Sequence, residues 1–133
     1  MKPIKLLGLA LALSIAGVLQ SQVMVSLNPG TPPQWGPAGY SDVRYYYLPD
    51  VEAYYDNQSS MFIYYSSGKW DSHSSLPDCY QNYDLYKGYK VVLSDYTGTT
   101  PYTHFYKHKK NFVKGYHHEI QKTVGSKPGR DRK

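Results

Sequence analysis

The sequence has only one cysteine, three phenylalanines and two tryptophans among its 133 residues. A single cysteine excludes an internal disulfide framework, so packing and hydrogen bonds must hold the fold together. Hydrophobic runs are also scarce. No stretch after residue 19 is long enough to span a bilayer, and the negative mean hydropathy excludes a polytopic membrane protein. The length suits one domain.

Tyrosine is what the chain has in excess: there are 16, against five Phe and Trp together. Because the core of such a short chain cannot hold all of them, we predict that some tyrosines pack the sheet and that others form a contact surface. Tyrosine gives a large contact area at a low entropic cost, which suits a glycan, a peptide or another envelope protein as the partner. The candidate contact residues are Tyr45, Tyr47, Tyr54, Tyr64 and Trp70.

The first 21 residues have the pattern of a secretory signal peptide. Lys2 and Lys5 precede a charge-free apolar run of 14 residues, 6–19, which is too short for a permanent membrane anchor. Cleavage after Ser21 would leave Gln22 at the new N-terminus. Because no cysteine follows the run directly, a lipoprotein anchor is excluded. We expect a secreted or periplasmic protein with no transmembrane segment after cleavage.

The remaining chain predicts a mainly β (α+β) fold. Residues 22–39 are rich in proline and glycine and indicate an extended leader, which Trp35 would pin onto a tyrosine-rich β domain at residues 40–115. Short connections between the strands favour an antiparallel meander of four or five strands. The candidate strands, rich in aromatic or β-branched residues, are residues 43–48, 51–55, 61–65, 70–73 and 90–93.

Two turns in this meander carry specific expectations. Pro49 and Asp50 indicate either a tight turn or a kink in one long edge strand. Residues 66–69 indicate a short hairpin turn in which Gly68 can take a positive φ. Both faces of the 61–65 strand are apolar or aromatic, so the sheet either lies under the leader and the C-terminal helix or presents a tyrosine surface.

A single helix is predicted at about residues 101–114, with Thr100 as its N-cap and Gly115 as its stop. After it, residues 116–133 read as a disordered basic tail, broken by glycine and proline. The partial apolar stripe of the helix consists of Tyr102, Phe105, Phe112 and Val113.

Charge divides sharply along the chain. Residues 22–106 carry four basic and eight acidic side chains, for a net charge of −4, whereas residues 107–133 carry nine and two, for a net charge of +7. We expect the basic end to adhere to an anionic surface, and a chain truncated after Gly115 to keep its fold. The alternative is an inert solvated terminus. No docking motif for nucleic acid is present, so nucleic acid is not an expected partner.

The histidines suggest one alternative function, a His-dependent metal-binding periplasmic protein. His104 and His108 lie four residues apart and would face the same side of the helix, with His117 and His118 as further ligands from the following loop. The competing interpretation is a solvated basic helix face on which the histidines are incidental. Phe105 stands where a His-Glu-x-x-His motif needs its glutamate.

No catalytic constellation is evident. Asp50 and Asp56 fall at turns, where aspartate usually caps backbone amides, and nothing fixes the geometry of Cys79 relative to His73. No glycine-rich loop precedes a helix. We therefore expect a non-enzymatic envelope binding or structural module without a cofactor.

Three stretches resemble a group of small secreted bacterial proteins rich in tyrosine. They are Tyr-Tyr-Tyr-Leu-Pro-Asp-Val-Glu-Ala-Tyr-Tyr-Asp at 45–56, Gly-Lys-Trp at 68–70 and Leu-Pro at 76–77. The similarity covers roughly residues 40–118. It implies a secreted bacterial context and one undivided domain, and it implies no particular activity.

The first prediction concerns export. Intact-mass measurement of the protein recovered outside the cytoplasm should show that about the first 21 residues are missing, because a signal peptide is removed during translocation. A soluble cytoplasmic pool that retains Met1 would contradict this.

Overall fold

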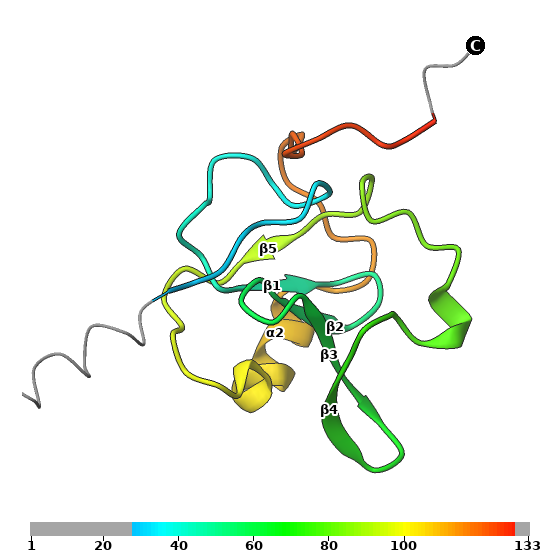
Figure 1. Cartoon of the computed structure of the whole chain (residues 1–133). Coiled ribbons are helices and arrows are strands. Elements are labelled where there is room, and N and C mark those ends of the chain that lie inside the picture. Colours follow the sequence, from blue (N-terminus) through cyan, green and yellow to red (C-terminus); the bar gives the residue numbers. More distant parts are fainter. Residues whose placement is uncertain (1–27, 130–133) are drawn as a thin grey trace, which may run out of the picture.

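The structure, a computed structural model, describes residues 28–129 as a five-stranded antiparallel sheet with one α-helix, which confirms the predicted mainly β architecture (Figure 1). The predicted signal peptide lies outside the described residues. Within them no helix has the length and apolar character needed to cross a membrane. The strands are β1 (Tyr45–Leu48), β2 (Ala53–Asp56), β3 (Met61–Ser66), β4 (Lys69–His73) and β5 (Val91–Val92), in the order β4-β3-β2-β1-β5.

Hairpins join the first four strands in sequence, and β5 returns to the free side of β1. The pair β1–β2 is therefore central, so Pro49 and Asp50 form a tight turn and not a kink in an edge strand. Its register places Tyr47 opposite Tyr54 and Tyr46 opposite Tyr55, with ring centroids 5.0 and 6.3 Å apart. Such cross-strand aromatic pairs stabilise an antiparallel sheet.

The β3–β4 turn has a positive φ at one residue more than predicted. Gly68 has the expected positive φ of 82°, but Ser67 before it also has a positive φ, of 54°. A two-residue hairpin loop in which both residues have positive φ matches the right-handed twist of the strands that it joins. The twist of the sheet therefore favours a positive φ at Ser67, which the residue type alone does not indicate.

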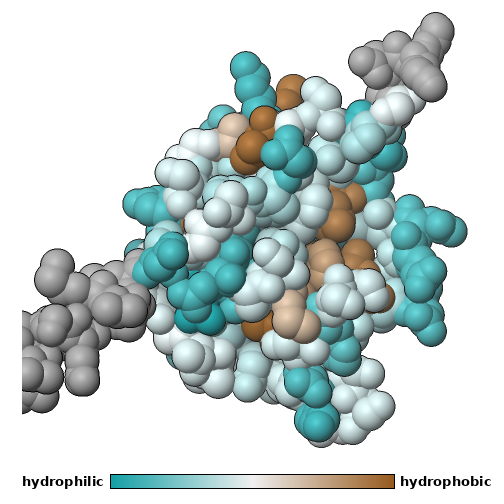
Figure 2. Space-filling model, in the orientation of Figure 1, coloured by the Kyte–Doolittle hydropathy of each residue, from teal (hydrophilic) through white to brown (hydrophobic). Residues whose placement is uncertain are grey.

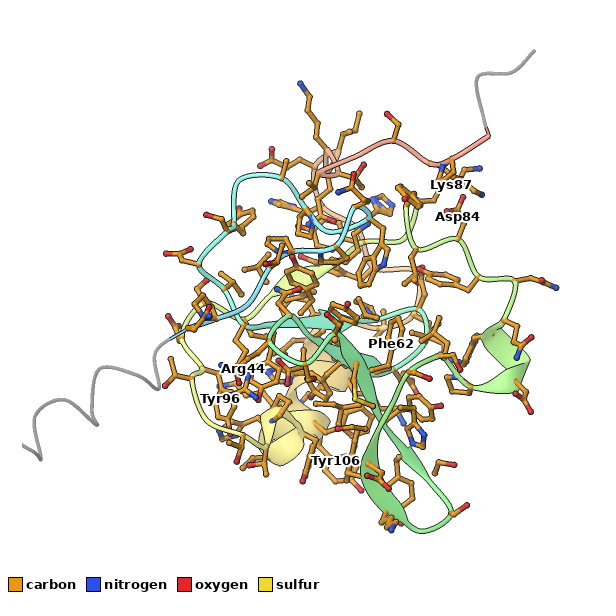
Figure 3. The ribbon with its side chains drawn as sticks, in the orientation of Figure 1. Arg44, Phe62, Asp84, Lys87, Tyr96 and Tyr106 are labelled. Carbon is orange, nitrogen blue, oxygen red and sulfur yellow. The ribbon has the colours of Figure 1, made fainter. Side chains whose placement is uncertain are left out.

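The leader covers one face of the sheet through Trp35, as predicted. The indole ring lies 6.1 Å from Tyr46, 4.7 Å from Tyr55 and 6.0 Å from Phe62, between ring centroids. Gly30 allows the leader to approach closely, since a Cβ there would lie 2.2 Å from the Asn57 carbonyl oxygen, and its φ is +96°. Figure 3 shows Phe62 in the middle of the molecule.

The helical segment covers the opposite face. It begins as the 3₁₀-helix η2 (Pro101–His104) and continues as α2 (Phe105–Asn111), so it ends earlier than the predicted residue 114. Thr100 lies at its start without a capping hydrogen bond from its side chain. Phe105 and Phe112 pack on the sheet, whereas Val113, assigned to the same stripe, is 59% exposed because the helix has already ended.

Both faces of the central strands β1 and β2 are thus buried beneath aromatic cover, whereas β4 and the end of β3 are largely exposed. In the view of Figure 2, strongly hydrophobic residues appear only as small patches within a pale or hydrophilic surface.

The predicted flexible tail is wrong for residues 121–125, which pair with the leader. The Ala38 N–H donates to the Lys122 carbonyl at 2.8 Å, and the Val124 N–H donates to the Gly36 carbonyl at 2.9 Å. Pro37 lies opposite Thr123 between these two bonds, where its missing N–H is not needed. Figure 1 shows the leader and this segment together on the side of the sheet away from α2.

Gln121 joins the same segment to the sheet. Its side-chain amide accepts a hydrogen bond from the Lys90 N–H at 2.9 Å and donates one to the Lys90 carbonyl at 2.7 Å. The Lys90 side chain is buried, its Nζ donates to the Leu85 carbonyl at 2.8 Å, and burial lowers its pKa to about 8. Truncation after Gly115 would remove these contacts, so the expectation that the shortened chain keeps its fold is withdrawn.

The second prediction tests this attachment. Gln121→Ala should lower the free energy of unfolding by about 1–3 kcal/mol, because it leaves two backbone groups of Lys90 unpaired. Gln81→Ala is the matched control, since Gln81 is exposed and makes only a 3.4 Å contact with Asp78. Denaturant unfolding of both variants measures the difference. Equal, small losses would show that residues 121–125 add nothing to stability.

Candidate binding groove

The structure places the five predicted contact residues in two environments. Tyr45, Tyr47 and Tyr54 are fully buried under η2 and α2, so their prediction as surface residues is wrong. Their rings belong to the hydrophobic core, because the helical segment packs over this face of the sheet. Tyr64 and Trp70 lie at the β3–β4 end of the sheet, and both line a groove, but Tyr64 is only 9% exposed and belongs to a core cluster.

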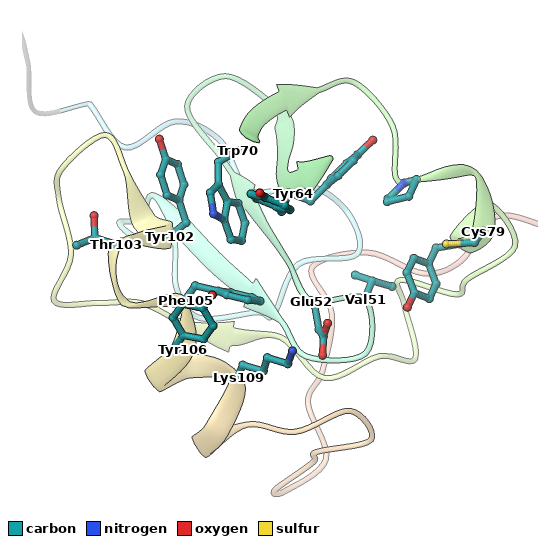
Figure 4. A pocket seen from close by; sticks show the side chains of 13 residues that line it. Val51, Glu52, Tyr64, Trp70, Cys79, Tyr102, Thr103, Phe105, Tyr106 and Lys109 are labelled. Atoms are coloured by element: carbon teal, nitrogen blue, oxygen red, sulfur yellow. The ribbon is translucent and has the colours of Figure 1, made fainter. Parts of the chain in front are cut away.

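This groove has a volume of about 590 Å³ and lies between the β3–β4 hairpin, the helical segment and the chain that follows β4 (Figure 4). We call it the aromatic groove, because seven of its lining residues are aromatic. β3 and β4 supply Tyr64, Tyr65 and Trp70; the 3₁₀-helix η1 (Asp78–Tyr80) supplies Tyr80; η2 and α2 supply Tyr102, Phe105 and Tyr106.

One wall of the aromatic groove is held by stacked rings. Trp70 lies parallel to Tyr102, with centroids 4.9 Å apart and planes at 3°, and meets Phe105 edge-on at 4.8 Å. These contacts join β4 to the helical segment and fix the relative position of the two. Tyr65 and Tyr106 remain 60% and 84% exposed. The groove therefore combines a fixed wall with two freely accessible rings.

Glu52 brings a carboxylate to the aromatic groove from the β1–β2 turn (Figure 4). Its φ is +51°, a conformation that costs a non-glycine residue about 1–3 kcal/mol. The neighbouring Asp50 anchors this turn, because it accepts hydrogen bonds from the Gly115 N–H at 2.7 Å and from the Tyr83 hydroxyl at 2.5 Å. The turn is thus held by two segments distant in sequence, the chain after η1 and the chain after α2.

Positive charge lies along α2 beside the aromatic groove. Lys107, Lys109 and Lys110 are exposed, and Lys109 lines the groove with its Nζ 5.8 Å from the Phe105 ring centroid. Within residues 28–129 the ion pairs are Arg44–Asp56, Lys69–Asp71 and Lys127–Asp84, so none involves α2. The helix therefore presents cations that no carboxylate of the described chain neutralises.

The four histidines considered as metal ligands have separate surroundings. The Nδ1 of the half-buried His108 lies 2.7 Å from the Tyr54 hydroxyl, whereas His104, His117 and His118 are exposed. The described part of the chain has no group of three or more His, Cys, Asp or Glu side chains placed to hold a metal ion. His108 thus acts in this structure as a hydrogen-bond partner that ties α2 to the sheet.

The residues weighed for catalysis have structural contacts. The Arg44 guanidinium forms two 3.0 Å bonds to Asp56. Although burial opposes ionisation there, hydrogen bonds from Arg44, Gln58 and Ser59 hold the pKa of the Asp56 carboxyl below its usual value. His73 stacks on Tyr64 at 4.2 Å, and Cys79 is an exposed free thiol at the margin of the aromatic groove.

Sequence reasoning missed Glu52, Tyr65, Lys109 and Tyr106 as groove residues. A partial signal existed for Tyr106: Tyr102, Phe105 and Phe112 define the buried stripe, so position 106 turns outward, and an outward tyrosine is a candidate contact. Glu52 had no such signal, because it falls within the predicted strand 51–55, and only the tertiary structure places it in a turn at the groove.

Comparison with protein-family models, with curated proteins and with solved structures finds no match to this chain. The resemblance to small secreted tyrosine-rich proteins therefore stays a prediction.

The third prediction concerns His108. Burial, followed by the nearby charges of His104 and Lys107, lowers the pKa of His108 below 6.5 in the folded protein. The unfolded chain then binds a proton first as the pH falls, so the stability contributed by the neutral ring is full above pH 6.5 and is lost as the pH drops below that value. Thermal unfolding between pH 8 and pH 5 measures this.

His108→Asn should flatten that part of the profile, because an amide oxygen replaces the acceptor Nδ1 without titrating. His117→Asn is the matched control and should leave the slope in place, since His117 is exposed and is not among the groups that shift the pKa of His108. A profile that is unchanged in His108→Asn would assign the pH dependence to other groups.

Proposed function

We propose that the chain is an exported, non-enzymatic binding module whose ligand lies in the aromatic groove. The observation that carries this proposal is the convergence of seven aromatic side chains from the sheet, η1 and the helical segment on one concave surface at the edge of the two buried clusters, where Tyr65 and Tyr106 belong to neither cluster. Concave surfaces lined by aromatic groups with a few polar ones are the usual form of a ligand site. Glu52 and Lys109 supply the polar groups.

The polar groups of the aromatic groove support binding more than catalysis. A catalytic nucleophile needs a base within hydrogen-bonding reach, and that base needs an orienting partner. Within residues 28–129, Glu52, Cys79 and Lys109 form no hydrogen bond with one another. Export is the second part of the proposal, and it rests on the signal-peptide pattern of residues 1–21. The ligand would then be met outside the cytoplasm.

The fourth prediction tests the groove without assuming a ligand. A photo-crosslinking benzoylphenylalanine at position 106, in cells that naturally make the protein, should give an adduct, because Tyr106 is 84% exposed at the groove. The same residue at position 40 is the matched control: Tyr40 is 45% exposed and lies away from the groove residues, beside residues 118–122. Equal adduct yields at the two positions would contradict the proposal.

A further inference from the structure

The lining of the aromatic groove is aromatic and hydroxylated, with very little aliphatic surface. Five tyrosines and Thr103 contribute hydroxyl groups. The aliphatic side chains of the lining are those of Val51, which is only 4% exposed, and Pro77. An acyl chain is bound by aliphatic side chains, which this groove lacks. A sugar ring instead offers C–H faces that stack on aromatic rings and hydroxyls that exchange hydrogen bonds with Tyr, Thr and Glu. The lining therefore favours a carbohydrate.

The charge beside the aromatic groove decides which kind of carbohydrate. From residue 101 to residue 118 the chain has four lysines, three of them on α2, and no Asp or Glu. Their ammonium groups are exposed and lack carboxylate partners among the described residues. Lys114 is already engaged, since it donates to the Tyr80 hydroxyl at 2.8 Å. Lys107, Lys109 and Lys110 remain to attract an anionic ligand, most strongly at low salt.

We propose that the ligand is an acidic polysaccharide, with its sugar rings stacked in the aromatic groove and its carboxylates facing Lys109, the α2 lysine that lines the groove. This inference rests on the proposed function and names the ligand class of the same site. A volume of about 590 Å³ falls in the range of ligand sites and suits a short run of sugar rings. Tyr65 and Tyr106 provide the accessible stacking faces, and Glu52 accepts hydrogen bonds from ring hydroxyls.

Calorimetry with four probes tests the proposal on the chain from residue 22 onward. Polygalacturonate should bind, and its affinity should fall steeply between 0.05 and 0.5 M salt, because the Debye length shortens from about 14 to about 4 Å. Its methyl ester keeps the sugar rings without the charge and should bind at least tenfold more weakly. Poly-L-glutamate keeps the charge without the rings and should also bind at least tenfold more weakly, as should phosphatidylglycerol vesicles.

Two pairs of variants locate the binding. Tyr106→Ala should weaken polygalacturonate binding by about tenfold through lost stacking, while Tyr40→Ala, outside the groove, should leave it unchanged. Lys109→Gln should weaken it about fivefold, while Lys87→Gln should not, because Lys87 lies far from the groove (Figure 3). All four side chains are exposed, so the variants should fold.

Three results would overturn the inference. Poly-L-glutamate bound as tightly as polygalacturonate would mean that charge alone acts. Vesicles bound more tightly than the polysaccharide would point to a membrane surface. If polygalacturonate does not bind but position 106 gives a groove-specific adduct, the ligand class is rejected and the proposed binding module stands. If neither is observed, the proposed function is rejected as well.

Discussion

The structure depends on one constraint: the large tyrosine rings of β1 and β2 must be covered on both faces of the sheet. Within the described residues the buried hydroxyls of Tyr46 and Tyr47 have no hydrogen-bond partner, so covering the rings outweighs pairing every hydroxyl. The central strands bury Tyr45 and Tyr54 completely, and each hydroxyl is met by a segment distant in sequence. Tyr45 donates to the Gly98 carbonyl at 2.9 Å, and Tyr54 meets His108 at 2.7 Å. The loop after β5 and the helix α2 are thereby placed by the hydroxyls of the sheet.

The same constraint separates the core from the contact surface. The leader and the helical segment cover the two faces of β1 and β2, so the tyrosines there cannot meet a ligand. The β3–β4 hairpin reaches the limit of that cover, and its aromatic side chains become one side of the aromatic groove. Trp70 belongs to both regions: it closes the core against Phe105 and Tyr102 and lines the groove.

The charge division along the chain takes a different form in three dimensions. The basic end is predicted to be a free tail, yet residues 121–125 are paired with the leader, and the Lys127 ammonium lies 3.0 Å from the Asp84 carboxylate. The lysines of α2 have no carboxylate partner among the described residues, and one of them, Lys109, lines the aromatic groove. Positive charge and aromatic surface, which the sequence assigned to separate functions, are thus combined in one candidate site.

The sequence alone determined the local features. Alternating aromatic residues, short polar turns and Pro101 after Thr100 predicted the meander, its hairpins and the helix, because strand and helix signals depend on neighbouring residues. Only the tertiary structure decided which tyrosines are buried, since that depends on what covers each face. The positions of Glu52 beside α2 and of Gln121 on Lys90 likewise depend on contacts across tens of residues, which no local pattern encodes.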